Sequence, residues 1–96
     1  MELEQVRTRV KVRLFHELRT SVGESEIEVQ ANTLNEVLQT LINMNGTVKD
    51  LLFDHEGQLR GYTLFYVNNA VQNPPDLSMK LNDGDLVLLV PAAAGG

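Results

Sequence analysis

The sequence of 96 residues contains no cysteine, which excludes disulfide bonds, thiolate metal ligands and a cysteine nucleophile. It also has no apolar run near the roughly 18 residues that a membrane-spanning helix requires. The opening stretch, MELEQVRTRV, lacks the apolar segment of a signal peptide. These absences predict a cytoplasmic protein that does not associate with membranes.

Basic residues are also few, since eight lysines and arginines stand against thirteen acidic residues and the net charge is −5. This balance disfavours binding to nucleic acids, because their phosphates would be repelled. Hydrophobic residues make up 43 % of the sequence and charged residues 22 %, which is typical of a folded domain. A chain of this length forms one domain around a single core.

Motifs for catalysis or metal binding are missing. His16 and His55 are the only histidines, and neither has a serine or carboxylate at the spacing of a triad or a metal site. The run NDGD at 82–85 lacks the bidentate glutamate of a calcium loop and is interpreted as a tight turn. No phosphate-binding loop, zinc-protease motif or serine-hydrolase motif is present. We therefore expect no metal site and no active site in the body of the domain.

Two early segments alternate between apolar and polar side chains, which predicts strands with one buried face. In the first, residues 6–14, the outer side carries Arg7, Arg9, Lys11 and Arg13. In the second, residues 24–30 after Gly23, the outer side carries Glu24, Glu26 and Glu28. An antiparallel hairpin across residues 17–23 would place the two rows together, with about 0.2–1 kcal/mol for each pair. The rows are then either a pairing of the sheet surface or a binding patch.

A helix is predicted from Thr33 to Met44. Thr33 and Glu36 form a capping box, and the apolar residues that follow recur at helical spacing. Asn45-Gly46 supplies a stop, because a left-handed residue costs little there. In residues 46–61 the sequence predicts only a helical turn at Val48, Leu51 and Leu52 and a polar turn at 54–57.

The last third of the sequence predicts three strands. Residues 62–67 are rich in β-branched and aromatic residues, Asn68-Asn69 forms a turn, and a short strand returns over 70–72. The run LVLLV at 86–90 is apolar on both faces, which is typical of a central strand. It is expected beside the first strand and parallel to it. The fold class is therefore α+β, a β-grasp in which a mixed sheet packs on one main helix.

The chain ends in PAAAGG, which cannot bury enough apolar surface to stay packed. Small residues also end many unstructured tails by chance. Here the composition favours a domain over 1–90 followed by a flexible tail over 91–96. Five extended residues of this tail reach about 16 Å and could enter a narrow channel in a partner. The carboxylate of Gly96 is ionised and needs activation before acyl chemistry, for which adenylation is the usual route.

Three segments, VKVRLFHELRTSVGE, LFYVNN and LNDGDLVLLVPAAAGG, resemble the MoaD/ThiS family of ubiquitin-like sulfur carriers over nearly the whole chain. The resemblance implies that Gly96, preceded by Gly95, is adenylated by a ubiquitin-activating-type enzyme that uses ATP. A thiocarboxylate then forms at that glycine. The chain itself would bind no cofactor and would not be catalytic alone.

Within this family the length and the segment LLFDHEGQLRGYTLFYVNN are similar to the small subunit of molybdopterin synthase and to the archaeal small modifier proteins. The first function expected is therefore sulfur donation, together with the large synthase subunit, in molybdenum cofactor biosynthesis. Ala92 stands where many such tails have a second proline, and Asn69 where a hairpin glycine is common, which leaves the pathway open.

Two alternatives remain. The chain could be a covalent protein modifier that forms isopeptide bonds to lysines, including Lys11, Lys49 or Lys80 of another copy, or it could be a passive interaction domain. The resemblance also implies a set of partner-binding residues on the outer sheet face and in the tail: Phe15, Val71, Val90, Pro91, Ala92, Ala93 and Ala94. Strand alternation independently places Phe15 outward, where it either anchors a partner or is covered by its own loop.

Overall fold

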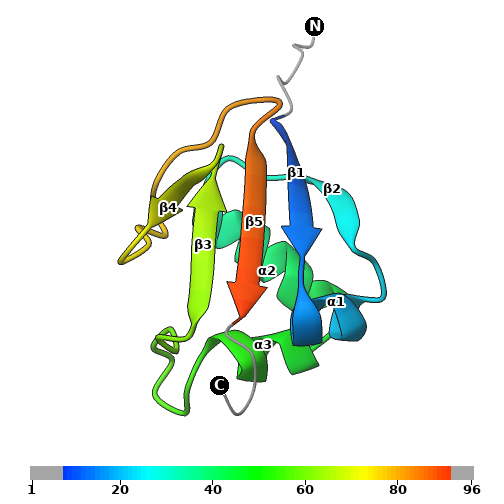
Figure 1. Cartoon of the computed structure of the whole chain (residues 1–96), viewed down its shortest axis with the longest axis vertical. Helices are drawn as coiled ribbons and strands as arrows, with labels where there is room; N and C mark the ends of the chain where they lie inside the picture. The colour runs from blue at the N-terminus through cyan, green and yellow to red at the C-terminus, as the bar shows by residue number, and fades with distance from the viewer. Residues whose placement is uncertain (1–7, 92–96) are drawn as a thin grey trace, which may run out of the picture.

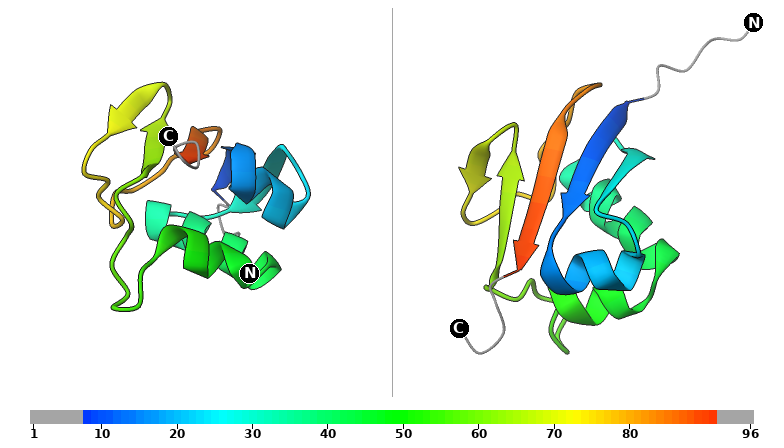
Figure 2. Two further views of the ribbon diagram at one scale, coloured as in Figure 1. Left: turned by 60° about the horizontal axis from the view of Figure 1, so that its bottom comes forward. Right: turned by 45° about the vertical axis from the view of Figure 1, so that its right-hand side comes forward.

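The structure, a computed structural model, describes residues 8–91. The predictions for Val6, Arg7 and residues 92–96 lie outside the described residues. Five strands form one sheet, and the helices lie on one of its faces (Figures 1 and 2). The elements in chain order are β1 (Arg9–Leu14), α1 (His16–Val22), β2 (Glu26–Gln30), α2 (Leu34–Met44), α3 (Thr47–Leu52), β3 (Thr63–Val67), β4 (Ala70–Gln72) and β5 (Leu86–Pro91).

The strand order across the sheet is β2-β1-β5-β3-β4. β1 and β5 run parallel, whereas β1 with β2, β3 with β4, and β3 with β5 run antiparallel. The last strand thus occupies the centre of a mixed sheet, as Figure 1 shows. This confirms the predicted β-grasp fold and the predicted parallel pairing of the first and last strands.

The hairpin of β1 and β2 is confirmed, with Arg13 opposite Glu26 and Lys11 opposite Glu28. Its connection, for which no helix was predicted, contains the helix α1. Leu18 is fully buried in the core and Gly23, at φ 90°, ends the helix, with its N–H bonded to the carbonyl of Arg19. One buried side chain in seven residues is too weak a periodic signal to indicate a helix.

The helix α2 begins as predicted, because the hydroxyl of Thr33 accepts the N–H of Glu36 at 3.2 Å. The carboxylate of Glu36 accepts the N–H of Asn32 at 2.7 Å. The predicted end at Met44 is also confirmed, but the predicted left-handed residue is wrong. Asn45 has an extended backbone at φ −156°. Its side chain donates to the carbonyl of Ser21 and accepts the N–H of Thr47, so it ties the end of α2 to the next helix.

The segment between α2 and β3 contains the short helix α3, which buries Val48 and Leu52 where the sequence predicted a helical turn. The predicted polar turn follows, inside an isolated bridge between Phe53 and Leu59. One carboxylate oxygen of Asp54 accepts the N–H groups of Glu56 and Gln58. These bonds, with that from Gln58 contributing most, hold the pKa of Asp54 below its usual range.

The core lies between α2 and the inner face of the sheet. Val87 and Leu89 of β5 are fully buried there, whereas Leu86, Leu88 and Val90 on the other face are half-buried. The turn at Asn68-Asn69 has positive φ at both residues, as predicted. The remaining buried apolar core residues come from every other helix and strand except β4 and from two loop positions: Val10, Val12, Leu14, Leu18, Val29, Ala31, Leu34, Val37, Leu38, Leu41, Val48, Leu52, Phe65, Val67 and Leu81.

Pro91 belongs to β5 and is buried, so the strand continues one residue past the predicted domain limit at residue 90. It lies opposite Thr63 in the ladder with β3. In the same ladder the N–H of Asn68 donates to the carbonyl of Leu86, which makes these two residues a hydrogen-bonded pair. Along an antiparallel ladder, hydrogen-bonded pairs alternate with pairs that are not hydrogen-bonded. Thr63 and Pro91 therefore form an unbonded pair, in which the missing N–H of proline breaks no bond to β3.

Thr63 is the single buried polar side chain among residues 8–91, and its hydroxyl has no hydrogen-bond partner in that part of the chain. It lines a cavity of about 250 Å³ together with apolar residues of the neighbouring loops, including Leu59 and Pro74. A buried hydroxyl without a partner costs about 1–3 kcal/mol. From the contacts of residues 8–91 we therefore expect the hydroxyl of Thr63 to lower the stability of the fold.

The same chemical change at two threonines should have opposite effects on stability. Thr63→Val removes the unpaired hydroxyl and should raise the free energy of unfolding by about 1 kcal/mol, or about 4–8 °C in Tm. Thr33→Val removes the helix cap and should lower it by about 0.5–2 kcal/mol. Thermal unfolding of both variants provides the measurement. A fall in Tm for Thr63→Val would mean that the hydroxyl is paired.

Candidate functional site

The face of the sheet opposite the helices is open to solvent (Figure 2). Alternation along the central strands places apolar side chains on it, and Leu64 and Val71 are 44 % and 53 % exposed. We call the following residues the outer patch: Leu64, Tyr66, Val71, Leu88 and Val90. A contiguous exposed apolar surface of this kind is typical of an interaction site.

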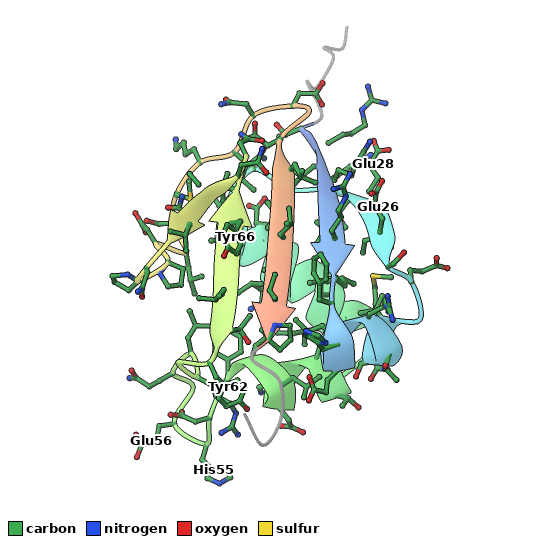
Figure 3. All side chains as sticks on the ribbon, viewed as in Figure 1. Glu26, Glu28, His55, Glu56, Tyr62 and Tyr66 are labelled. Carbon is green, nitrogen blue, oxygen red and sulfur yellow. The ribbon has the colours of Figure 1, made fainter. Side chains whose placement is uncertain are left out.

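The strand registers bring the outer patch together from three strands. Tyr66 of β3 lies opposite both Val71 of β4 and Leu88 of β5, while Leu64 lies opposite Val90. Tyr66 is visible over β3 on the open face in Figure 3. The patch thus consists of two adjacent rows that cross the middle of the sheet.

Two of the three predicted sheet residues, Val71 and Val90, belong to these rows. Phe15 follows β1 with an extended backbone, so it continues the alternation beyond Leu14 on the outer side, and it is half-buried. Leu14 lies opposite Leu89, which places Phe15 near the end of the Leu64–Val90 row. Phe15 is thus neither fully exposed nor fully covered by its own loop.

The sequence reasoning missed three members of the outer patch: Leu64, Tyr66 and Leu88. The signal was present, because the segments YTLFYV and LVLLV are apolar on both parities. The exposed Tyr62, which precedes β3, was also missed. The sequence does not show which of the two alternating sets of side chains faces the helices. Only the arrangement of the helices on one side of the sheet decides this.

A charged strip borders the outer patch on β1 and β2. Arg13 Nε lies 2.8 Å from Glu26 Oε1, and Lys11 Nζ lies 3.8 Å from Glu26 Oε2. Arg9 Nε is 3.8 Å from both Glu28 and Asp83. The predicted pairing of the two rows is confirmed. Each of these exposed pairs contributes little to stability, about 0–1 kcal/mol.

The chain leaves the sheet at Pro91, at the same edge where β1 ends, because β1 and β5 run parallel (Figure 1). Pro91, expected to bind a partner, is buried against its own sheet, so its ring is part of the fold rather than of a surface. The remaining predicted tail residues, Ala92, Ala93, Ala94, Gly95 and Gly96, lie outside the described residues.

The two histidines do not form a site with each other. His16, at φ 56°, begins α1, while His55 lies exposed at the tip of the loop after α3 (Figure 3). Within residues 8–91 no group of three or more histidine and carboxylate side chains could hold a metal ion. No helix in that range is both long and apolar enough to span a membrane.

Comparison with known proteins matches a model of the ThiS family to residues 12–96. A protein of Archaeoglobus fulgidus, described as an inferred sulfur carrier, is 28 % identical over 88 residues, 91 % of this chain and 98 % of that protein. Small archaeal modifier protein 1 from Methanosarcina acetivorans has a similar structure, with a TM-score of 0.80 and 25 % identity over 96 % of this chain and all of that one. A chain of the BexX/CysO complex of Amycolatopsis orientalis gives 0.76 and 29 % identity over 91 % of this chain and 99 % of that one.

Substitution on the two faces of the sheet should separate the outer patch from the core. Val71→Asp should lower the free energy of unfolding by less than about 1 kcal/mol, because the side chain is already half in water. Val87→Asp should cost more than about 4 kcal/mol, since it buries an unpaired charge. Urea denaturation measures both values. A large loss for Val71→Asp would show that the patch is structural.

Proposed function

This chain belongs to the ThiS family of ubiquitin-like proteins, and we propose that it is a sulfur carrier that is loaded at the carboxylate of Gly96. The observation that carries the proposal is the family match, which extends from β1 through Gly95 and Gly96. The body of the domain supplies a binding surface for partners, and the C-terminal glycine supplies the reactive group. The chain is not a catalyst alone.

Two balanced steps load the sulfur. A carboxylate oxygen of Gly96 attacks the α-phosphorus of ATP held by an adenylating enzyme, and pyrophosphate leaves. Hydrosulfide then attacks the acyl carbon, AMP leaves, and loss of a proton gives the thiocarboxylate without any change of oxidation state. Glycine suits this attack because no Cβ crowds the carbon. Because the sequence has no cysteine, the sulfur is carried by the main chain.

The outer patch is the docking surface in this proposal. It borders the edge at which β5 ends, so a partner that covers Leu88 and Val90 is close to the root of the tail. Burial of these half-exposed side chains would favour association at about 25 cal/mol for each Å² of apolar surface removed from water. Ala92, Ala93 and Ala94 would then pass into the partner as a thin segment.

As the recipient of the sulfur we propose the large subunit of molybdopterin synthase. The support for this finer assignment is the resemblance of residues 51–69 to the small synthase subunits. In that complex the thiocarboxylate at Gly96 would donate its sulfur for the dithiolene of molybdopterin, and this chain would be the sulfur-donating subunit.

Activation of Gly96 can be measured directly. With the matched adenylating enzyme of the source organism, the wild-type chain should support exchange of pyrophosphate into ATP. Deletion of Gly96 should abolish the exchange and leave Tm within about 1 °C, because a residue beyond the packed strand contributes almost nothing to stability. Val71→Asp should raise the KM for the carrier on the order of tenfold, which corresponds to about 1.4 kcal/mol. Absence of exchange with the wild type would contradict the proposal.

A second candidate, covalent protein modification, is favoured by the likeness to the Methanosarcina modifier protein over the whole of that chain. In this case a lysine amine displaces AMP from Gly96 in place of hydrosulfide, and an isopeptide bond forms. A second copy of the protein would offer Lys11, Lys49 and Lys80 as acceptors.

Mass spectrometry of material from the native host separates the two candidates. A carrier should show sulfur in place of one terminal oxygen in the intact mass. A modifier should leave its C-terminal segment on the lysines of other proteins, which after trypsin digestion is residues 81–96, because Lys80 is the last basic residue. Expression of the Gly96 deletion supplies the control, since it should remove both marks.

A further inference from the structure

The charges nearest to the outer patch are cations. Leu88 and Leu86 of β5 lie opposite Arg13 and Lys11 of β1 in the parallel ladder. Glu26 lies one strand further out, on β2 at the edge of the sheet, as Figure 3 shows for the labelled glutamates. A partner that covers the patch therefore meets Arg13 and Lys11 before it meets any carboxylate of β2.

One carboxylate serves both of these cations. Glu26 accepts a hydrogen bond from Arg13 Nε at 2.8 Å through Oε1, while its other oxygen lies 3.8 Å from Lys11 Nζ. Glu26 is thus shared between two cations, while Glu28 lies opposite Lys11 in the ladder. Arg9, at the far end of β1, differs in having two carboxylates, those of Glu28 and Asp83.

The pairing of Glu26 with Arg13 is exposed and therefore easy to exchange. Their side chains keep 40 % and 49 % of their surface in water, and in residues 8–91 the guanidinium makes no other hydrogen bond. Such pairs contribute little because water competes for both groups. A carboxylate brought in by a partner and shielded from water by the apolar contact next to it would compete more strongly.

We propose that Glu26 competes with a carboxylate of the adenylating partner for Arg13. The partner docks on the outer patch, and its carboxylate replaces Glu26 beside Arg13. The inference rests on the proposed function and adds the chemistry of the partner surface: an apolar side chain over Leu64 and Leu88, flanked by an aspartate or glutamate over Arg13. With a net charge of −5 the protein repels an acidic surface elsewhere, so Arg13, the cation opposite Leu88, sets the orientation.

Neutralising Glu26 should therefore strengthen binding, although it removes a native ion pair. In Glu26→Gln a neutral amide, which is a weaker acceptor, replaces the carboxylate that competes with the partner for Arg13. We expect the Kd for the adenylating enzyme, measured by calorimetry without ATP, to fall roughly two- to fivefold. Glu28→Gln is the matched control and should leave Kd unchanged, since Glu28 lies opposite Lys11 but its ion pair among residues 8–91 is with Arg9, at the far end of β1.

A double-mutant cycle tests the mechanism. Arg13→Gln should raise Kd about fivefold or more, and Glu26→Gln should bring no gain in that background. The difference between wild type and Glu26→Gln should also shrink as salt is raised. Melting temperatures of all variants show whether each one is folded.

The outcomes distinguish the two proposals. If adenylation of the wild type proceeds but Glu26→Gln binds no more tightly than Glu28→Gln, the competitor role is wrong and the sulfur carrier stands. The competitor role is also wrong if Glu26→Gln still lowers Kd when Arg13 has been replaced by glutamine. If the enzyme neither binds nor adenylates the wild type, the proposed function fails, and the competitor role fails with it.

Discussion

The parallel pairing of β1 with β5 constrains the rest of the structure. Parallel neighbours cannot be joined by a tight turn, so the chain between them has to leave the sheet and cross it through α2 before it returns. The last strand then lies in the centre, where Val87 and Leu89 are fully buried. Because both strands end at the same edge, Phe15 lies beside Val90 there, next to the outer patch.

The second constraint is that all helices lie on one face. A chain of this size has enough helix to cover the inner face, and Leu64, Val71 and Leu88 remain on the other with part of their surface in water. Polar side chains on this outer face would lower the free energy of the isolated protein in water relative to these apolar ones. In the proposed function the two roles are separate, because the sheet would offer apolar surface for recognition while the chemistry of a sulfur carrier requires only a terminal carboxylate.

Most of the fold could be predicted from local patterns. The alternation in β1 and β2, the β-branched and aromatic residues of β3, the cap at Thr33 and the turn at Asn68-Asn69 depend on neighbouring residues alone, and all were predicted correctly. The helix α1 was missed because its single core residue, Leu18, is buried by contacts from distant segments. The end of α2 was placed correctly for a wrong reason, since Asn45 is held by Ser21, which lies 24 residues away.

By itself the sequence determined the absence of thiol chemistry, the class of fold and the composition of the C-terminal segment, because these follow from residue types and their spacing along the chain. Only the tertiary structure decided which apolar side chains form the outer patch, that Glu26 is shared by Lys11 and Arg13, and that the hydroxyl of Thr63 has no partner in the described residues. Each of these depends on the register between strands far apart in sequence, and a shift of one residue would turn every side chain to the opposite face.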